Sequence, residues 1–172
     1  MSQSLRLAVL ITHPIQYFRP VFAELAQQPG LELRVFFGCD HGRRSSLDPD
    51  FGVSFAWDVP AHEGFPHTFI SHAPLEQLSR LRSALPLALR SASAISAWQP
   101  DQVLIFAYTP LFISLSTLLL MIRGQSLLLR ADGTDRAFPR SWLKSSIKDF
   151  VLRLWYRQFR HVFPIGADSD RH

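Results

Sequence analysis

The residues best suited to chemistry follow an apolar run near the N-terminus. Leu5–Ile11 is apolar at every position except Arg6, and His13, Gln16 and Tyr17 come soon after it. A histidine titrates near neutral pH, so the His13 imidazole could hydrogen-bond a substrate hydroxyl or a phosphate. The amide of Gln16 and the phenol of Tyr17 could bind the hydroxyls of a ligand. The alternatives are a structural His13 that shapes the turn before Pro14, and a capping and packing role for Gln16 and Tyr17.

Two later strand ends supply further polar side chains. Tyr108 follows the predicted strand Gln102–Phe106, and Arg130 and Asp132 lie at the end of the next strand. Arg130 and Asp132 could form a pair that orients a ligand, or an ordinary surface ion pair. Because the carboxyl ends of parallel strands line one edge of a sheet, we expect these residues near His13, in a substrate-binding site.

Several kinds of site are excluded or disfavoured. Thr12–Tyr17 stands where a dinucleotide-binding fold would place its glycine-rich loop, which speaks against bound NAD. Cys39 is the only cysteine, so the chain cannot form an intramolecular disulfide, and a cysteine-based zinc site is nearly excluded. His62, His67 and His72 recur every fifth residue, a spacing that fits neither a helix face nor one side of a strand. We therefore predict no metal and no bound cofactor.

Strands and helices alternate along the chain. The predicted strands are Leu5–Ile11, Leu31–Phe37, Gln102–Phe106, Ser126–Arg130 and His161–Ile165, and the predicted helices are Pro20–Gln28, Leu78–Trp98, Leu111–Ile122 and Ser141–Phe159. Asp40–Pro74 is irregular, with Val53–Trp57 and His67–Ile70 as minor strands that pair with each other. Thr109 is the expected cap of a helix that starts with Pro110. The alternation predicts an α/β fold with a Rossmann-like, doubly wound, mainly parallel sheet over residues 1–166, followed by the start of a linker or tail at 167–172.

The charge and the apolar segments leave several partners open. The formal net charge is +4, which suits phosphates, nucleic acid or an anionic membrane, or simply a solvated basic face. No recognition motif supports nucleic acid. Ser141–Phe159 interleaves basic and aromatic residues, as an interfacial membrane helix would, although a core-packed helix is favoured. Val103–Ile122 has no charged residue and is long enough to span a bilayer, but Pro110 in its middle favours a strand followed by a helix.

Three segments, in this order, resemble the N-terminal domain of the family 4 (retaining) glycosyltransferases of the GT-B fold. They are His13–Phe18, Leu128–Gly133 and His161–Gly166. The resemblance covers nearly the whole chain. Ala131 stands where the family often has glycine, and Asp132 where it often has glutamate.

The resemblance implies half of a two-domain enzyme. The N-terminal domain would bind a saccharide or lipid-linked acceptor, and a C-terminal domain that this chain lacks would bind the nucleotide-sugar co-substrate. The isolated half is expected to be inactive, and we assign no catalytic base because retention of configuration does not require one. The resemblance also implies a cytoplasmic protein at the inner face of the membrane, in peripheral contact with it. The alternative is a non-catalytic Rossmann-like module for protein interaction.

Overall fold

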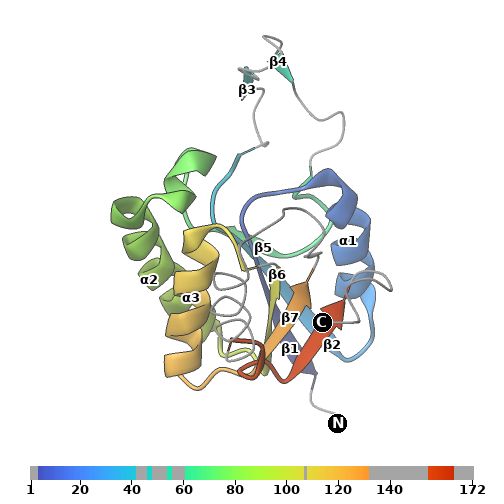
Figure 1. Ribbon diagram of the computed structural model, residues 1–172. Coiled ribbons are helices and arrows are strands. Elements are labelled where there is room, and N and C mark those ends of the chain that lie inside the picture. The colour runs from blue at the N-terminus through green and yellow to red at the C-terminus, as the bar shows by residue number, and fades with distance from the viewer. Residues whose placement is uncertain are drawn as a thin grey trace.

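The computed structural model describes residues 4–41, 46–47, 54–55, 61–106, 108–131 and 155–164. In this part of the chain, six parallel strands form one sheet between two layers of helices (Figure 1). The strands are β1 (Leu5–Ile11), β2 (Leu31–Phe37), β5 (His67–Phe69), β6 (Gln102–Phe106), β7 (Leu127–Ala131) and β8 (His161–Pro164), in the order β5-β2-β1-β6-β7-β8. Counted along the chain, that order is third, second, first, fourth, fifth, sixth, which is the Rossmann order. The predicted doubly wound α/β fold is confirmed.

The helices cover both faces of the sheet. α1 (Arg19–Gln27) lies on one face, while α2 (Leu81–Trp98) and α3 (Leu111–Ile122) lie side by side on the other (Figure 1). Short 3-10 turns, η1 (Gln16–Phe18) and η2 (Leu75–Ser79), precede α1 and α2.

The central strand, β1, is apolar at every position from Leu7 to Ile11 because both of its faces are covered. Ala8 and Leu10 of β1 belong to the core under α2 and α3. Val9 and Ile11 belong to the core under α1. Successive side chains of a strand point to opposite faces, and here both faces are buried.

The long segment after β2 differs from the prediction in one respect. His67–Phe69 does not pair with the segment around Ser54–Phe55; it joins the main sheet as β5, parallel to β2. Ser54–Phe55 (β4) pairs instead with Ser46–Leu47 (β3) in a separate antiparallel ribbon. Backbone bonds extend the β5 pairing on both sides, since the Val35 N–H donates to the Pro66 carbonyl and the Ile70 N–H donates to the Phe37 carbonyl. The expectation of two minor strands paired together is wrong.

The start of α2 and the cap of α3 also differ from the prediction. α2 begins at Leu81 rather than Leu78, because Arg80 is extended between it and η2. α3 begins at Leu111 with Pro110 as its N-cap, so Thr109 does not cap it. The Ser114 hydroxyl of α3 donates instead to the Tyr108 carbonyl.

The end of the predicted Ser141–Phe159 helix packs on the core. Phe159 is buried, and Trp155 is partly buried against the core under α2 and α3, while Arg157 and Arg160 are exposed. The packing interpretation holds for this end; residues 141–154 lie outside the described residues, as do 165–172. Within the described residues, no helix is both long enough and apolar enough to cross a bilayer.

Candidate functional site

The topological switch point of the sheet, where the order of the strands reverses, lies beside β1. β1 pairs with β2 on one side and with β6 on the other, and the chain order reverses between β1 and β6. In open α/β sheets ligands bind outside the carboxyl ends of the strands at such a switch point. Thr12 and His13 follow β1 there, and Tyr108 follows β6.

His13 is half-buried and neutral. Its Nδ1 lies 2.9 Å from the Thr12 hydroxyl, and its ring meets the His41 ring edge-on at 5.4 Å between centroids. Burial, together with charge repulsion from His41, lowers the pKa of His13 to about 4. A neutral imidazole suits a substrate hydroxyl better than a phosphate, so the geometry favours the first of the two predicted ligands.

The chain after β2 is bound closely to the chain after β1. The Gly38 N–H donates to the Ile11 carbonyl, and the Cys39 N–H donates to the Thr12 carbonyl, both at 2.9 Å. A Cβ at Gly38 would lie 2.6 Å from Cε1 of Phe112, so only glycine fits this approach. The backbone segments that carry His13 and Asp40 are therefore held in one unit.

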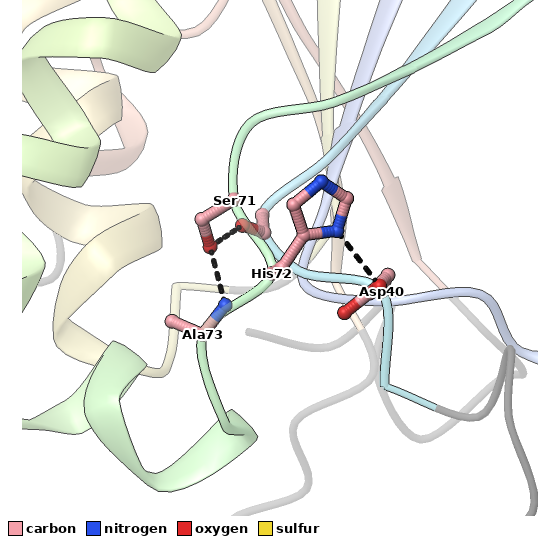
Figure 2. Close-up of polar contacts among 5 residues, drawn as sticks. Asp40, Ser71, His72 and Ala73 are labelled. Carbon is pink, nitrogen blue, oxygen red and sulfur yellow. Dashed lines mark hydrogen bonds and ion pairs between the residues drawn. The ribbon is translucent and has the colours of Figure 1, made fainter.

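Asp40 and His72 form a pair at this edge of the sheet. His72 Nδ1 lies 2.8 Å from Asp40 Oδ2, and the side chains are 74% exposed for His72 and 15% exposed for Asp40. Figure 2 shows how the neighbouring backbone is held: the Ser71 hydroxyl donates to the Gly38 carbonyl at 2.8 Å and accepts from the Ala73 N–H at 3.3 Å. In the neutral form of the imidazole, a carboxylate at Nδ1 favours the tautomer with the proton there, which leaves Nε2 of the largely exposed His72 as an acceptor.

The sequence interpretation missed this pair. It placed Asp40 after a main strand but treated His72 as one histidine of a long loop. The available indication was the short run His67–Ile70, whose assignment as a main-sheet strand would have put His72 at the same edge as Asp40.

Arg130 lies on a second group of side chains. Its guanidinium stacks over the Phe18 ring at 4.5 Å and the Phe106 ring at 5.0 Å. The exposed Tyr17 ring packs edge-on against the same Phe18 ring, with 4.4 Å between centroids. The structure thus brings Tyr17 and Arg130 together across Phe18. Asp132 lies outside the described residues, so its pairing with Arg130 stays a prediction.

Gln16, the first residue of η1, and Tyr108, which follows β6, are both half-buried. The N-cap positions of η1 and α1 are Ile15 and Phe18, so neither Gln16 nor Tyr17 serves as an N-cap. A ligand role for Gln16 or Tyr108 stays a prediction.

Neither a cysteine nucleophile nor a metal site is supported by the described residues. Burial raises the pKa of the Cys39 thiol to about 11, so the thiol is protonated at neutral pH and a poor nucleophile. Within the described residues, no group of three histidine, cysteine or acidic side chains could hold a metal ion.

The comparisons with known proteins give a fold and no family. No protein-family model matches the sequence, and no curated protein matches it. In structure the chain is similar to a protein from Listeria monocytogenes provisionally assigned as a UDP-N-acetylglucosamine 2-epimerase, with a TM-score of 0.55 and 14% sequence identity. The similarity covers 98% of this chain and 41% of that protein, which has a GT-B-type fold. The chain therefore has the Rossmann-like fold of part of a GT-B-type protein and spans less than half of that neighbour's length.

Proposed function

We propose that this chain is the acceptor-side half of a sugar-nucleotide-processing enzyme, a glycosyltransferase related to family 4. It would help transfer a sugar from a nucleotide-sugar to a saccharide or lipid-linked acceptor at the cytoplasmic face of a membrane. The nucleotide-sugar would be held mainly by a second domain. The similarity to an assigned UDP-N-acetylglucosamine epimerase supports the sugar-nucleotide class, and the half-enzyme reading fits the alignment of 98% of this chain with only 41% of that protein.

The observation that carries the proposal is a set of groups at the carboxyl edge of the sheet that can bind hydroxyls: His13 at the switch point, and the Asp40–His72 pair at the ends of β2 and β5. His13 is neutral, and the Asp40–His72 pair leaves an imidazole nitrogen open to solvent. The loop after β1 lacks the glycines that let a backbone approach a pyrophosphate. This edge suits the hydroxyls of an acceptor better than the phosphates of a donor.

The residues would divide the work as follows. His13 and the Asp40–His72 pair would bind and orient the acceptor hydroxyl that attacks the sugar. Tyr17, held beside Arg130 by their common contact with Phe18, would contact the rest of the acceptor. Gln16, Tyr108 and Asp132 remain proposed ligand contacts.

A titration of the chain with UDP- and GDP-sugars tests the missing donor half. We expect no tight binding, and micromolar affinity would overturn this part of the proposal. Joining a following GT-B-type donor domain should then give sugar transfer, which His13→Ala should reduce. His161→Ala is the matched control, because His161 is an exposed histidine at the amino end of β8, away from the switch point. A two-domain form that neither transfers nor hydrolyses any nucleotide-sugar would favour the protein-interaction module instead.

A further inference from the structure

α2 and α3 present large aliphatic side chains to solvent. On α2, Leu81, Leu85 and Leu89 follow one another at intervals of four residues, and on α3, Leu118 and Ile122 have the same spacing. Residues four apart lie on one face of a helix. These five side chains are between 44% and 74% exposed. A helix that packs on a sheet normally carries polar residues on its solvent side, so this surface departs from the usual pattern.

The two sets belong to one surface. α2 and α3 pack side by side on the same face of the sheet (Figure 1). The guanidinium of Arg123 donates to the Ser93 hydroxyl at 3.0 Å and to the Ser96 hydroxyl at 3.4 Å. Ser93 is one turn beyond Leu89 on α2, and Arg123 directly follows Ile122. The side of α2 that bears the leucines therefore borders the exposed side of α3, and we call the five side chains the α2–α3 face.

The charged residues of α2, α3 and their caps are all arginines, while an exposed acid, Glu76, lies on η2, which packs on both helices. Arg80, Arg82, Arg90 and Arg123 are exposed on or beside the two helices. Neither helix contains an aspartate or a glutamate. Long arginine side chains can lay their methylene stems on apolar surface while the guanidinium reaches a polar partner. The face thus offers apolar side chains bordered by cations from these two helices.

This combination selects among possible partners. A second copy of the chain would bring arginines against arginines. A nucleic acid offers phosphates but little apolar surface for the leucines. A bilayer with anionic head groups offers an acyl boundary for the leucines and phosphates for the arginines in the same plane. We propose that the α2–α3 face docks on an anionic lipid bilayer.

The docking surface lies away from the predicted membrane helix Ser141–Phe159 in sequence and does not depend on sugar transfer. It lies on one face of the sheet, whereas the proposed acceptor site lies at the carboxyl ends of the strands. A protein docked through this face would leave its switch-point edge uncovered by the bilayer contact and open to a ligand.

Sedimentation with lipid vesicles tests the proposal on the chain as it stands. We expect binding to vesicles of phosphatidylcholine mixed with phosphatidylglycerol, weak binding to phosphatidylcholine alone, and loss of binding as salt is raised. Leu85→Gln with Leu89→Gln should weaken binding at least about tenfold, because two leucines no longer enter the apolar boundary. Arg82→Gln and Arg90→Gln should each weaken it about fivefold.

Matched controls separate this face from general effects. Val162→Gln and Arg160→Gln change exposed residues at or next to β8 and should bind as the wild type does. If the circular-dichroism spectrum shows that the leucine variant is unfolded, the binding of the arginine variants to vesicles tests the α2–α3 face instead.

Three results would overturn the proposal. The first is wild-type affinity in the leucine and arginine variants. The second is equal binding to neutral and anionic vesicles. The third is an absence of binding to anionic vesicles. If the chain is then a dimer that the leucine variant disrupts, the occupant of the face is a second copy of the chain.

Discussion

Gly38 lies where the chain after β2 meets both the chain after β1 and α3, and its replacement by alanine tests how tightly this edge is built. The added Cβ would lie 2.6 Å from Cε1 of Phe112 and 3.0 Å from the Thr12 carbonyl oxygen. Carbon atoms in good contact are about 3.5–4.0 Å apart, so the methyl group is roughly 1 Å too close to the ring. Phe112 is fully buried and cannot swing into solvent.

Gly38→Ala should therefore lower the free energy of unfolding by about 1–3 kcal/mol, the usual cost of an overpacked core. For a domain of this size, that corresponds to a fall in Tm of about 2–12 °C. Urea denaturation followed by circular dichroism measures the first quantity, and a thermal scan measures the second.

A double variant identifies the cause. Phe112→Leu removes Cε1, the atom that the new methyl group meets at the shortest distance, so adding it to Gly38→Ala should cost less than the sum of the two single changes. We expect a coupling free energy of about 1 kcal/mol or more. Gly30→Ala is the control: its Cβ would meet nothing within 4 Å, and its φ of +78° gives a backbone cost that Phe112→Leu cannot relieve. Full stability of Gly38→Ala, or strict additivity with Phe112→Leu, would refute the steric explanation.

Three further predictions concern single residues. The pKa of His13 is about 4 in the fold against its usual 6.5, so the unfolded chain binds the proton more tightly. The free energy of unfolding should therefore fall as the pH drops from about 6.5 toward 4, by about 1–2 kcal/mol after allowance for solvent screening. Urea denaturation at each pH measures this loss, which should be absent in His13→Gln. Asp40→Ala should remove the hydrogen bond to His72 Nδ1. Nitrogen-15 NMR spectra of the imidazole should then show more of the Nε2–H tautomer. An unchanged spectrum would mean that the Asp40–His72 pair does not form in solution. The Asp101 carboxylate accepts the Arg6 N–H at 2.7 Å, so Asp101→Ala should cost about 1 kcal/mol and speed exchange of that amide, whereas Asp101→Asn should retain part of the bond.

The first and last residues of three strands and one helix were predicted correctly from the sequence. Leu5–Ile11, Leu31–Phe37, Gln102–Phe106 and Leu111–Ile122 have the predicted bounds, because each is mainly apolar, as burial on both faces of a sheet or against one requires. The charged residues within these strands, Arg6, Glu32 and Arg34, are half-buried or exposed. Their alternation was enough to predict the doubly wound sheet.

The short strand His67–Phe69 was not predictable in the same way. It has three residues, all half-buried, and its partner β2 lies far earlier in the chain. Local sequence does not specify such a pairing, which depends on the space that β2 leaves at the edge of the sheet. This strand brings His72 to Asp40. Because the strand was not predicted, the Asp40–His72 pair was not predicted either.

The candidate site was predicted as a set of strand ends rather than as contacts. Their position at the carboxyl edge follows from parallel topology. The stacking of Arg130 on Phe18, with Tyr17 beside it, depends on how η1 turns, which the sequence does not specify.

The central position of β1 also has a consequence for how the chain is made. β1 leaves the ribosome before the other strands of the sheet, and β2 can pair with it early. Its other neighbour is β6, whose register with β1 starts at Leu7 and Gln102. Until β6 emerges, one side of this apolar central strand has unpaired N–H and C=O groups. An open strand edge is a template for pairing with the wrong chain. Nascent chains or truncations that end before Phe106 should therefore aggregate, and the Asp101–Arg6 bonds form only when this exposed edge is closed.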